Sequence, residues 1–255
     1  MYPVLLHLYG PLSIHSYGAA IVVGLLLFTY LVLHHPQRAK LVSSEQLFDI
    51  MTVGIVAGLI GGRLLYVISE QHAESWTSLL FSLQGFSLLG SVIAIVASLA
   101  VYLQVHRIPA LPFLDLVAIY APLLQAAGRI GCFLAGCCYG APASVWWAVT
   151  YTHPEVDAPL CMALHPSQLY SAGILVCIFL VLRFVIQHRV TKPGQLIGCY
   201  LMLMSAERFI TDFFRFDHHQ LVGQWGMSVY QWISLAIFAA AATLLFFISL
   251  TPARR

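Results

Sequence analysis

The chain has 255 residues, of which 60% are hydrophobic and only 9% are charged, and its mean hydropathy is +0.86. Soluble domains carry about 25% charged residues, so this composition excludes an ordinary soluble enzyme and indicates an integral membrane protein. The 12 Lys and Arg residues exceed the 10 Asp and Glu residues by two. This excess is too small and too scattered for a nucleic-acid-binding surface.

Seven apolar runs are long enough to cross a bilayer, which takes about 20 residues. They predict an all-α, polytopic membrane protein with about seven transmembrane helices, at roughly 14–33, 47–69, 79–105, 111–127, 169–187, 195–214 and 228–250. We expect one integral membrane domain over residues 1–255, with an external excursion at about 141–168. No Lys or Arg precedes the first run, so we expect it to remain as a helix rather than to be a cleaved signal peptide.

The basic residues are distributed unequally between alternate loops. Segments 1–13 and 70–78 contain no Lys or Arg, whereas the other loops and the C-terminus contain eight basic residues: Arg38, Lys40, Arg107, Arg183, Arg189, Lys192, Arg254 and Arg255. Because Lys and Arg concentrate in cytoplasmic loops, this pattern predicts an external N-terminus and a cytoplasmic C-terminus.

Four further arginines are not explained by that topology, which places Arg63, Arg129, Arg208 and Arg215 in the outer half of the membrane. Arginine inside a membrane is costly and marks a candidate functional site. Each one alone could instead reach the outer headgroups or pair with an aspartate. Four at one level favour a site for an anion.

The segment 128–140, GRIGCFLAGCCYG, is the most informative in the chain. Arg129 offers a planar fork of donors suited to phosphate or carboxylate, and glycine permits close approach of the backbone. Cys132, Cys137 and Cys138 add three thiols, for which packing, redox or metal chemistry, and direct participation in a reaction all remain open. The mixture indicates a site rather than a packed core.

Two other stretches contain polar groups that could join this site. In His165–Tyr170, HPSQLY, Ser167 is a candidate N-cap for the next helix and His165 a candidate acid or base. Further on, Arg208 and Asp212 are four residues apart and therefore lie on one helix face.

These motifs, together with GGRLLY around Arg63, IHSYG around Tyr17 and ERFITDFFR from Glu207, give the chain a specific likeness. It resembles the phosphatidylglycerol–prolipoprotein diacylglyceryl transferases of bacterial inner membranes over most of its length. The resemblance implies a multi-pass inner-membrane enzyme. Its partners would be phosphatidylglycerol and prolipoprotein signal peptides with a lipobox cysteine. The enzyme would transfer a diacylglyceryl group to that cysteine, form a thioether and release glycerol phosphate, without a metal or other cofactor.

The resemblance implies roles for Arg129, Arg208, Tyr17, His15, Asp212, Gly136 and Gly140, and the residues and motifs themselves add the other candidates. The catalytic candidates are Arg129, Arg208, His165, Tyr17 and His15. The candidates for substrate binding are Arg63, Gly136, Gly140, Gln168, Tyr170, Asp212 and Arg215.

The chain departs from the family pattern at several positions. Cys132 and Cys137 replace an asparagine and a glutamate, Leu89 replaces a histidine that is a favoured catalytic base, Ser171 replaces a glutamate, and Glu70 stands where a tyrosine is expected. The base could then be His165, His15 or Asp212, or no dedicated base is needed. The alternatives to transfer are a membrane thiol-redox or metal-handling protein that uses the three cysteines, and a non-catalytic lipid-binding relative.

Overall fold

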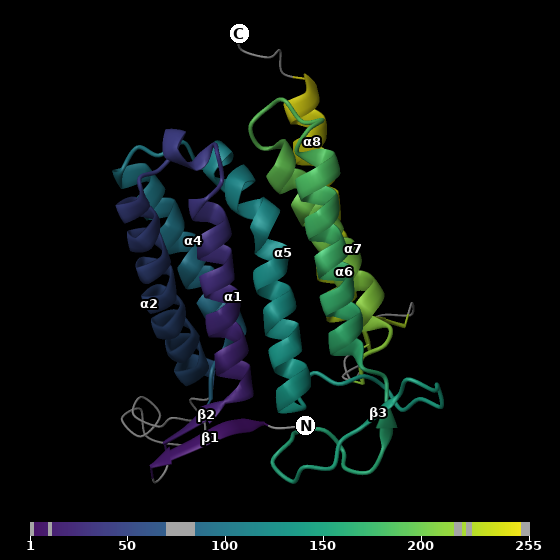
Figure 1. The fold of residues 1–255 in the computed structure, drawn as a ribbon. Helices are drawn as coiled ribbons and strands as arrows, with labels where there is room; N and C mark the ends of the chain where they lie inside the picture. Colours follow the sequence, from purple (N-terminus) through teal and green to yellow (C-terminus); the bar gives the residue numbers. More distant parts are fainter. Residues whose placement is uncertain (1–2, 10–11, 70–84, 217–220, 223–225, 251–255) are drawn as a thin grey trace. The chain divides into compact units, whose positions relative to one another are not determined.

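The computed structural model describes residues 3–9, 12–69, 85–216, 221–222 and 226–250, and it is predominantly helical (Figure 1). The long helices are α1 (Ser16–Leu33), α2 (Ser44–Ser69), α4 (Leu88–Val105), α5 (Ala110–Ala135), α6 (Ser167–Val181), α7 (Gln195–Asp212) and α8 (Val229–Leu250). A 3₁₀ turn, η1 (Arg38–Lys40), precedes α2, and a π-helical turn, η2 (Leu182–Ile186), follows α6.

Three short antiparallel pairs of strands are the only sheets in these described ranges. They join β1 (Val4–Tyr9) to β2 (Leu12–His15), β3 (Val149–Thr150) to β4 (Ala163–Leu164), and β5 (Leu221–Val222) to β6 (Met227–Ser228). Glu70 and the beginning of the third predicted run lie outside the described residues.

Among the residues that the structure describes, six helices are long and apolar enough to cross a membrane: Ser16–Leu33, Ser44–Ser69, Leu88–Val105, Ala110–Ala135, Ser167–Ile186 and Val229–Leu250. This confirms the predicted all-helical, polytopic class. The sixth predicted run forms α7, which is not among the six, because Glu207, Arg208 and Asp212 all lie within its 18 residues.

The chain forms two compact units, one made of residues 1–32 and 114–255 and the other of residues 33–113. In the second unit, α2 and α4 pack closely through small residues. A Cβ at Gly58 would lie 3.0 Å from the Ile95 side chain, and one at Gly61 would clash with Ala94. The Ser91 hydroxyl donates a hydrogen bond of 2.8 Å to the Gly58 carbonyl. Gly58 and Gly61 therefore serve helix packing, as small residues do in membrane helices.

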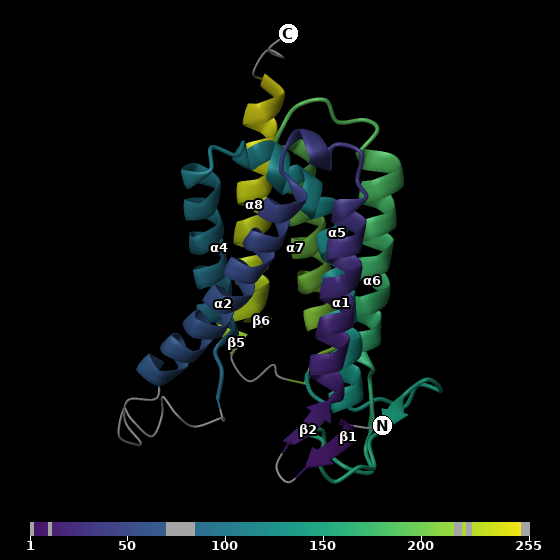
Figure 2. The ribbon, with the colours of Figure 1, turned by 60° about the vertical axis from the view of Figure 1, so that its left-hand side comes forward.

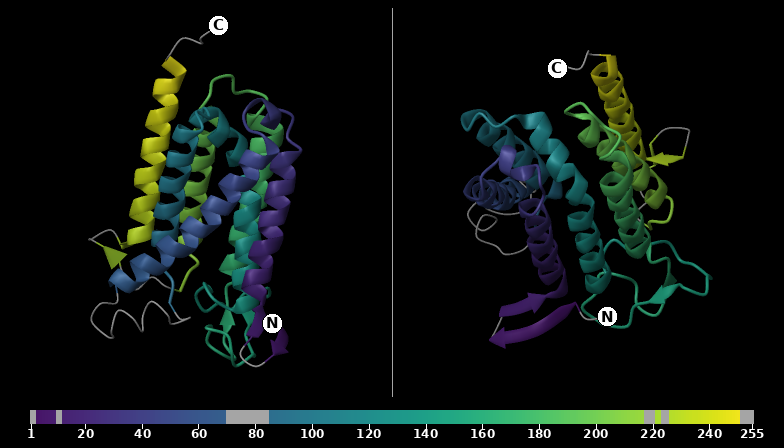
Figure 3. Two further views of the ribbon diagram at one scale, coloured as in Figure 1. Left: turned by 90° about the vertical axis from the view of Figure 1, so that its left-hand side faces the viewer. Right: turned by 45° about the horizontal axis from the view of Figure 1, so that its top comes forward.

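In the first unit, α1 packs against α5, and α7 packs against both α6 and α8 (Figures 2 and 3). Glycines again permit close approach, because a Cβ at Gly24 would lie 2.7 Å from Ala127 and one at Gly131 would lie 3.0 Å from Ala20. Within this unit, the β1–β2 hairpin and the segment 136–166 lie at one end of the helices. The C-terminal end of α8 lies at the other end (Figure 1).

Side chains from a neighbouring helix and a loop satisfy two helix ends at the end opposite segment 136–166. The Asp115 carboxylate on α5 accepts hydrogen bonds from the backbone N–H groups of Gly194 (2.6 Å) and Ile197 (2.8 Å). It thereby caps the N-terminus of α7, where a negative charge is favourable. The Lys192 ammonium donates to the carbonyls of Ile248 and Ser249 at the end of α8.

The fourth predicted run is longer than its apolar composition indicated. We expected a helix at 111–127 with Arg129 just beyond it, but α5 continues to Ala135 and includes Arg129. Its extension is stable because Gly128 and Gly131 face α1, where Ile21 and Ala20 fill the space beside them. Gly136, with φ +75°, then ends the helix in the left-handed conformation common at helix C-termini.

Candidate functional site

Three of the four singled-out arginines meet in one hollow of the first unit. Arg129 comes from the last two turns of α5, Arg208 from the last turns of α7, and Arg215 from the segment just after α7. We call this hollow the arginine pocket, and the residues that line it are Arg129, Cys138, Ser167, Gln168, Ser171, Arg208, Thr211 and Arg215. The predicted convergence of arginines is therefore present for these three.

Arg129 is half-buried and forms no hydrogen bond or ion pair with any other residue that the structure describes. Its five N–H donors are arranged as a planar fork that matches two oxygens of a phosphate or carboxylate. A half-buried guanidinium without such a partner in the described protein is suited to receive one from a ligand.

Arg208 is held in place from two sides. Its guanidinium lies 3.6 Å from an Asp212 carboxylate oxygen and 4.9 Å from the centre of the Tyr230 ring on α8. The other Asp212 oxygen accepts a hydrogen bond from the Ser228 hydroxyl at the start of α8. The predicted pairing of Arg208 with Asp212 on one helix face is confirmed. Asp212 is therefore engaged by two partners within the protein.

A second buried carboxylate, Glu207, was not predicted as part of the site. It is 3% exposed and accepts hydrogen bonds from the hydroxyls of Ser171 and Thr211, both of which line the arginine pocket. The resemblance described above expects a glutamate where Ser171 stands. In this chain α7 brings a carboxylate to Ser171 from another helix. An ionisable residue inside an apolar helix is the sequence signal that could have identified Glu207.

The loop after α5 is fixed by hydrogen bonds from the start of α6. Gln168 Nε2 donates to the Cys137 carbonyl (2.7 Å), and the Ser167 hydroxyl donates to the Cys138 carbonyl (3.1 Å). The prediction that Ser167 caps α6 is wrong, since Pro166 occupies the cap position and no side chain caps this end. The Ser167 hydroxyl binds the loop instead.

Gly140 is the point at which three segments meet. Its N–H donates to the His165 carbonyl (3.0 Å), and the neighbouring Ala141 N–H donates to the Phe214 carbonyl (2.9 Å). A Cβ at Gly140 would lie 2.5 Å from the first carbonyl oxygen and 2.6 Å from the second. Only glycine fits there, and the contact ties segment 136–166 to the segment that carries Arg215.

His165 and Tyr170 lie beside the arginine pocket but do not line it. Their side chains are 3.1 Å apart, from His165 Nδ1 to the Tyr170 hydroxyl, and both rings contact Phe214. The Tyr170 hydroxyl also accepts a hydrogen bond of 2.5 Å from the Trp147 indole. Trp147, in the excursion expected at about 141–168, therefore contacts this pair through Tyr170.

The remaining predicted residues lie outside the arginine pocket. Tyr17 is 43% exposed at the start of α1, where its backbone packs on Gly131, and His15 is exposed and bonded to Ser13. Arg63 belongs to the second unit, where it donates to the Gly85 carbonyl (2.7 Å) and lies over the Tyr66 ring. Leu89, in the same unit, is 64% exposed.

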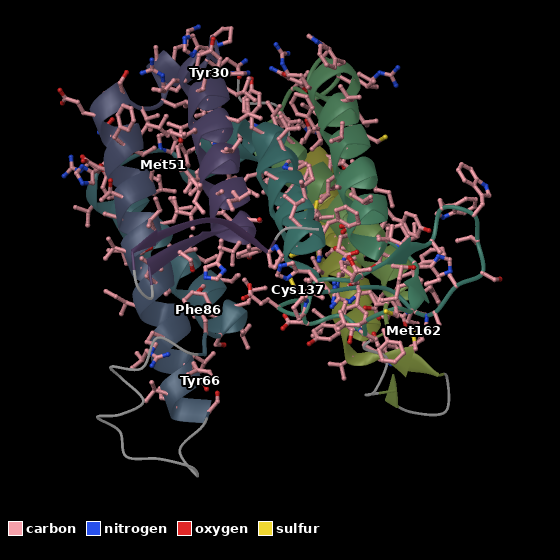
Figure 4. All side chains as sticks on the ribbon, turned by 60° about the horizontal axis from the view of Figure 1, so that its bottom comes forward. Tyr30, Met51, Tyr66, Phe86, Cys137 and Met162 are labelled. Atoms are coloured by element: carbon pink, nitrogen blue, oxygen red, sulfur yellow. The ribbon has the colours of Figure 1, made fainter. Side chains whose placement is uncertain are left out.

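The three cysteines of segment 128–140 come together at the edge of the arginine pocket. The Sγ atoms of Cys132, Cys137 and Cys138 all lie within 4.8 Å of one another (Cys137 is labelled in Figure 4). Hydrogen bonds from the other two thiols lower the pKa of Cys138, and Arg215 lowers it further. Hydrogen bonds with Cys132 and Cys138 raise the pKa of Cys137. Among the three, Cys138 is thus the thiol that ionises first.

Comparison with known proteins identifies the family to which the chain is similar. Residues 3–247 match the family described as prolipoprotein diacylglyceryl transferase. A relative from Clostridium tetani, named phosphatidylglycerol–prolipoprotein diacylglyceryl transferase, is 34% identical over 92% of this chain and 93% of its own length. Proteins with the same name from Clostridium perfringens (number 2 of that species) and Dechloromonas aromatica are 31% and 30% identical. They cover 89% and 93% of this chain, and 88% and 92% of their own lengths.

Proposed function

The chain belongs to the prolipoprotein diacylglyceryl transferase family, and on that premise we propose that it transfers the diacylglyceryl group of phosphatidylglycerol to the lipobox cysteine of prolipoproteins. The reaction forms a carbon–sulfur bond and breaks the bond between the lipid carbon and the phosphate oxygen. Glycerol phosphate leaves, and the thiol proton is lost. No observation favours the thiol-redox, metal-handling or non-catalytic alternatives as the main activity.

The observation that supports this proposal best is the convergence of Arg129, Arg208 and Arg215 on one hollow. Negative charge increases on the phosphate as it leaves. Charge-assisted hydrogen bonds from preorganised guanidinium groups stabilise that charge in a site of low dielectric. Two buried carboxylates, Glu207 and Asp212, offset part of the positive charge of the three arginines.

The arginine pocket is narrow, so a phosphate enters it only if the long arginine side chains move outward. Gln168 adds an acceptor to the same lining, because its Oε1 atom is buried and has no hydrogen-bond partner among the described residues. A buried acceptor without a partner is costly. A hydroxyl of the lipid's glycerol headgroup would satisfy it, which a choline headgroup cannot do because it has no N–H or O–H donor.

Helix α7 also offers a place for a fatty-acyl chain. Arg208 and Thr211 face the arginine pocket, whereas Ser205, Ala206, Phe209 and Ile210 line a separate, mainly apolar and open cavity of about 220 Å³. Ser234, Leu235 and Phe238 of α8 line the same cavity. A ligand with a phosphate at one end and a hydrocarbon chain at the other fits a helix with these two faces.

The acceptor thiol attacks as a thiolate, and the surroundings of the three candidate bases support His165. Asp212 is engaged by Arg208 and Ser228, and His15 is exposed at the β2 end. His165 is half-buried, is oriented by Tyr170, and accepts a hydrogen bond from Gly140 at its own carbonyl. Two residues that closely follow it in sequence, Ser167 and Gln168, line the arginine pocket.

We also propose that α7 is the seventh membrane crossing, with its three charged residues shielded by α6 and α8. The basic loops then face the cytoplasm of a bacterium, and the segment 136–166 lies on the outer side of its inner membrane. An enzyme in this position meets both lipid and exported prolipoprotein.

The test is transfer of labelled diacylglyceryl from phosphatidylglycerol to a lipobox peptide by the purified chain, together with complementation of a bacterial strain depleted of its own transferase. We expect a labelled thioether that resists alkaline hydrolysis, and growth of the depleted strain. Folded protein that yields no thioether and supports no growth would refute the proposal.

A further inference from the structure

Binding of a phosphate does not require the clustering of Cys132, Cys137 and Cys138. The cluster therefore needs an explanation of its own. Cys132 lies in the last turn of α5, and the left-handed Gly136 reverses the chain so that Cys137 and Cys138 return to it. Cys138 itself has φ +55°, a conformation that side chains other than glycine rarely adopt. This backbone directs three thiols to one point.

The loop is also held in that conformation before any ligand arrives. The carbonyls of Cys137 and Cys138 accept hydrogen bonds from Gln168 and Ser167, and the Cys137 thiol donates to the Cys132 carbonyl at 3.8 Å. Cys132 is buried, and the other two thiols are half-buried. Backbone strain that the surroundings maintain is a recurrent feature of ligand sites.

We propose that these three thiols bind one monovalent copper ion. Soft thiolate ligands select Cu(I) and zinc among the metals of biology. A metal about 2.3 Å from each of three sulfurs in a plane would hold them roughly 4 Å apart. The Sγ atoms, all within 4.8 Å of one another, need only small shifts to reach that spacing.

The number of ligands favours copper over zinc. A structural zinc site takes four protein ligands in a tetrahedron, and no fourth His, Cys, Asp or Glu joins the cluster in the parts of the chain that the structure describes. Three-coordinate, planar sites suit Cu(I). Binding forms three copper–sulfur bonds, breaks three S–H bonds and releases the protons to solvent. Nothing is oxidised or reduced.

Copper binding would change the charge beside the arginine pocket. Three thiolates with one Cu(I) carry a net charge of −2. Arg215 contacts Cys138, and Arg129 lies near Cys132. The complex therefore competes with a lipid phosphate for both guanidinium groups. This consequence rests on the proposed function: bound copper should raise the KM for phosphatidylglycerol and act as an inhibitor rather than a cofactor.

The direct test measures binding without reference to activity. The full chain, reduced and kept anaerobic in detergent, is titrated with Cu(I) against a Cu(I) chelator of known affinity. We expect one copper per chain and sulfur-to-copper charge-transfer absorbance. Cys132→Ser, Cys137→Ser and Cys138→Ser should each weaken binding at least about tenfold, since even residues that only support metal ligands contribute that much.

The other three cysteines provide a matched control. A Cys161→Ser/Cys177→Ser/Cys199→Ser variant should bind copper as the unmodified chain does, because these residues lie outside the cluster. Melting temperatures identify any serine variant that fails to fold, and Cd²⁺ absorbance gives a second measure of the three thiolates. Unchanged affinity in a variant that lacks all three cluster cysteines would overturn the proposal, and so would weakened binding in the control variant.

The two proposals fail in different ways. If copper binds stoichiometrically but the chain transfers no lipid, the copper site stands and the proposed function falls. If lipid is transferred and copper neither binds nor changes the KM for phosphatidylglycerol, the transferase stands and the copper site falls.

Discussion

Replacing an arginine of the pocket by lysine separates binding of the lipid phosphate from structural roles. Lysine keeps the positive charge but loses the planar fork. Arg129 forms no hydrogen bond or ion pair with another described residue, so the loss in Arg129→Lys falls on the ligand. Each lost charge-assisted bond is worth roughly 1.5–3 kcal/mol. The transfer rate should then fall about ten- to more than a hundredfold if the loss is confined to the transition state.

The same change at two other arginines should give different patterns. Arg208→Lys should reduce transfer as strongly and also lower the melting temperature, because the contact of Arg208 with Tyr230 contributes about 0.5–2 kcal/mol. Arg63→Lys should keep most of its transfer per folded molecule, since a lysine ammonium can still donate to the Gly85 carbonyl. The assay is transfer of labelled diacylglyceryl to a lipobox peptide, normalised to folded protein.

The reasoning fails if Arg129→Lys and Arg208→Lys both transfer lipid at nearly the unmodified rate. These residues would then not hold the phosphate. Family membership would describe the fold of this chain without fixing its mechanism. A large fall in transfer by Arg63→Lys at normal stability would instead add Arg63 to the lipid site.

Three further predictions concern the fold, topology and metal dependence. Gly140→Ala should lower the melting temperature and the yield of folded protein, because its Cβ would meet two carbonyl oxygens, whereas Gly173→Ala, with open space around it, should not; equal melting temperatures would contradict the three-segment junction. Reporters fused after residues 40, 107 and 190 should read cytoplasmic, and those after 74, 157 and 220 external; a cytoplasmic reading at 157 would remove segment 136–166 from the side where prolipoproteins arrive. Transfer should survive dialysis against a chelator, and a loss of activity that zinc or copper restores would show that a metal is required.

Much of the arginine pocket could be predicted from single residues. Arg129, Arg208 and Arg215 stood out because an arginine in an apolar run is costly, and this cost is visible without a structure. Asp212 followed from its spacing to Arg208 on a helix. Composition and helical spacing thus suffice to predict site residues that stand out within one segment.

Contacts between distant segments could not be predicted in this way. Glu207 reaches Ser171 only because α6 and α7 pack together, and Trp147 reaches Tyr170 across 23 residues of sequence. The end of α5 was misplaced for a related reason. Glycine weakens an isolated helix, but Gly128 and Gly131 lie against α1, and this packing carries the helix past Arg129.

The hydrogen bond from Gly194 to Asp115 joins α5 and α7 at one point, and the arginines on the two helices lie equally far along the chain from it. Arg129 lies fourteen residues after Asp115 on α5, and Arg208 lies fourteen residues after Gly194, the residue that Asp115 binds. At 1.5 Å per residue, both guanidinium-bearing positions stand about 21 Å from a shared origin. One residue inserted into either helix between this contact and the arginine would displace the arginine by about 1.5 Å and turn it by about 100° about the helix axis. The two positively charged groups would then no longer meet. The number of residues between the Asp115 contact and the arginine pocket is therefore as tightly constrained as the residues of the pocket.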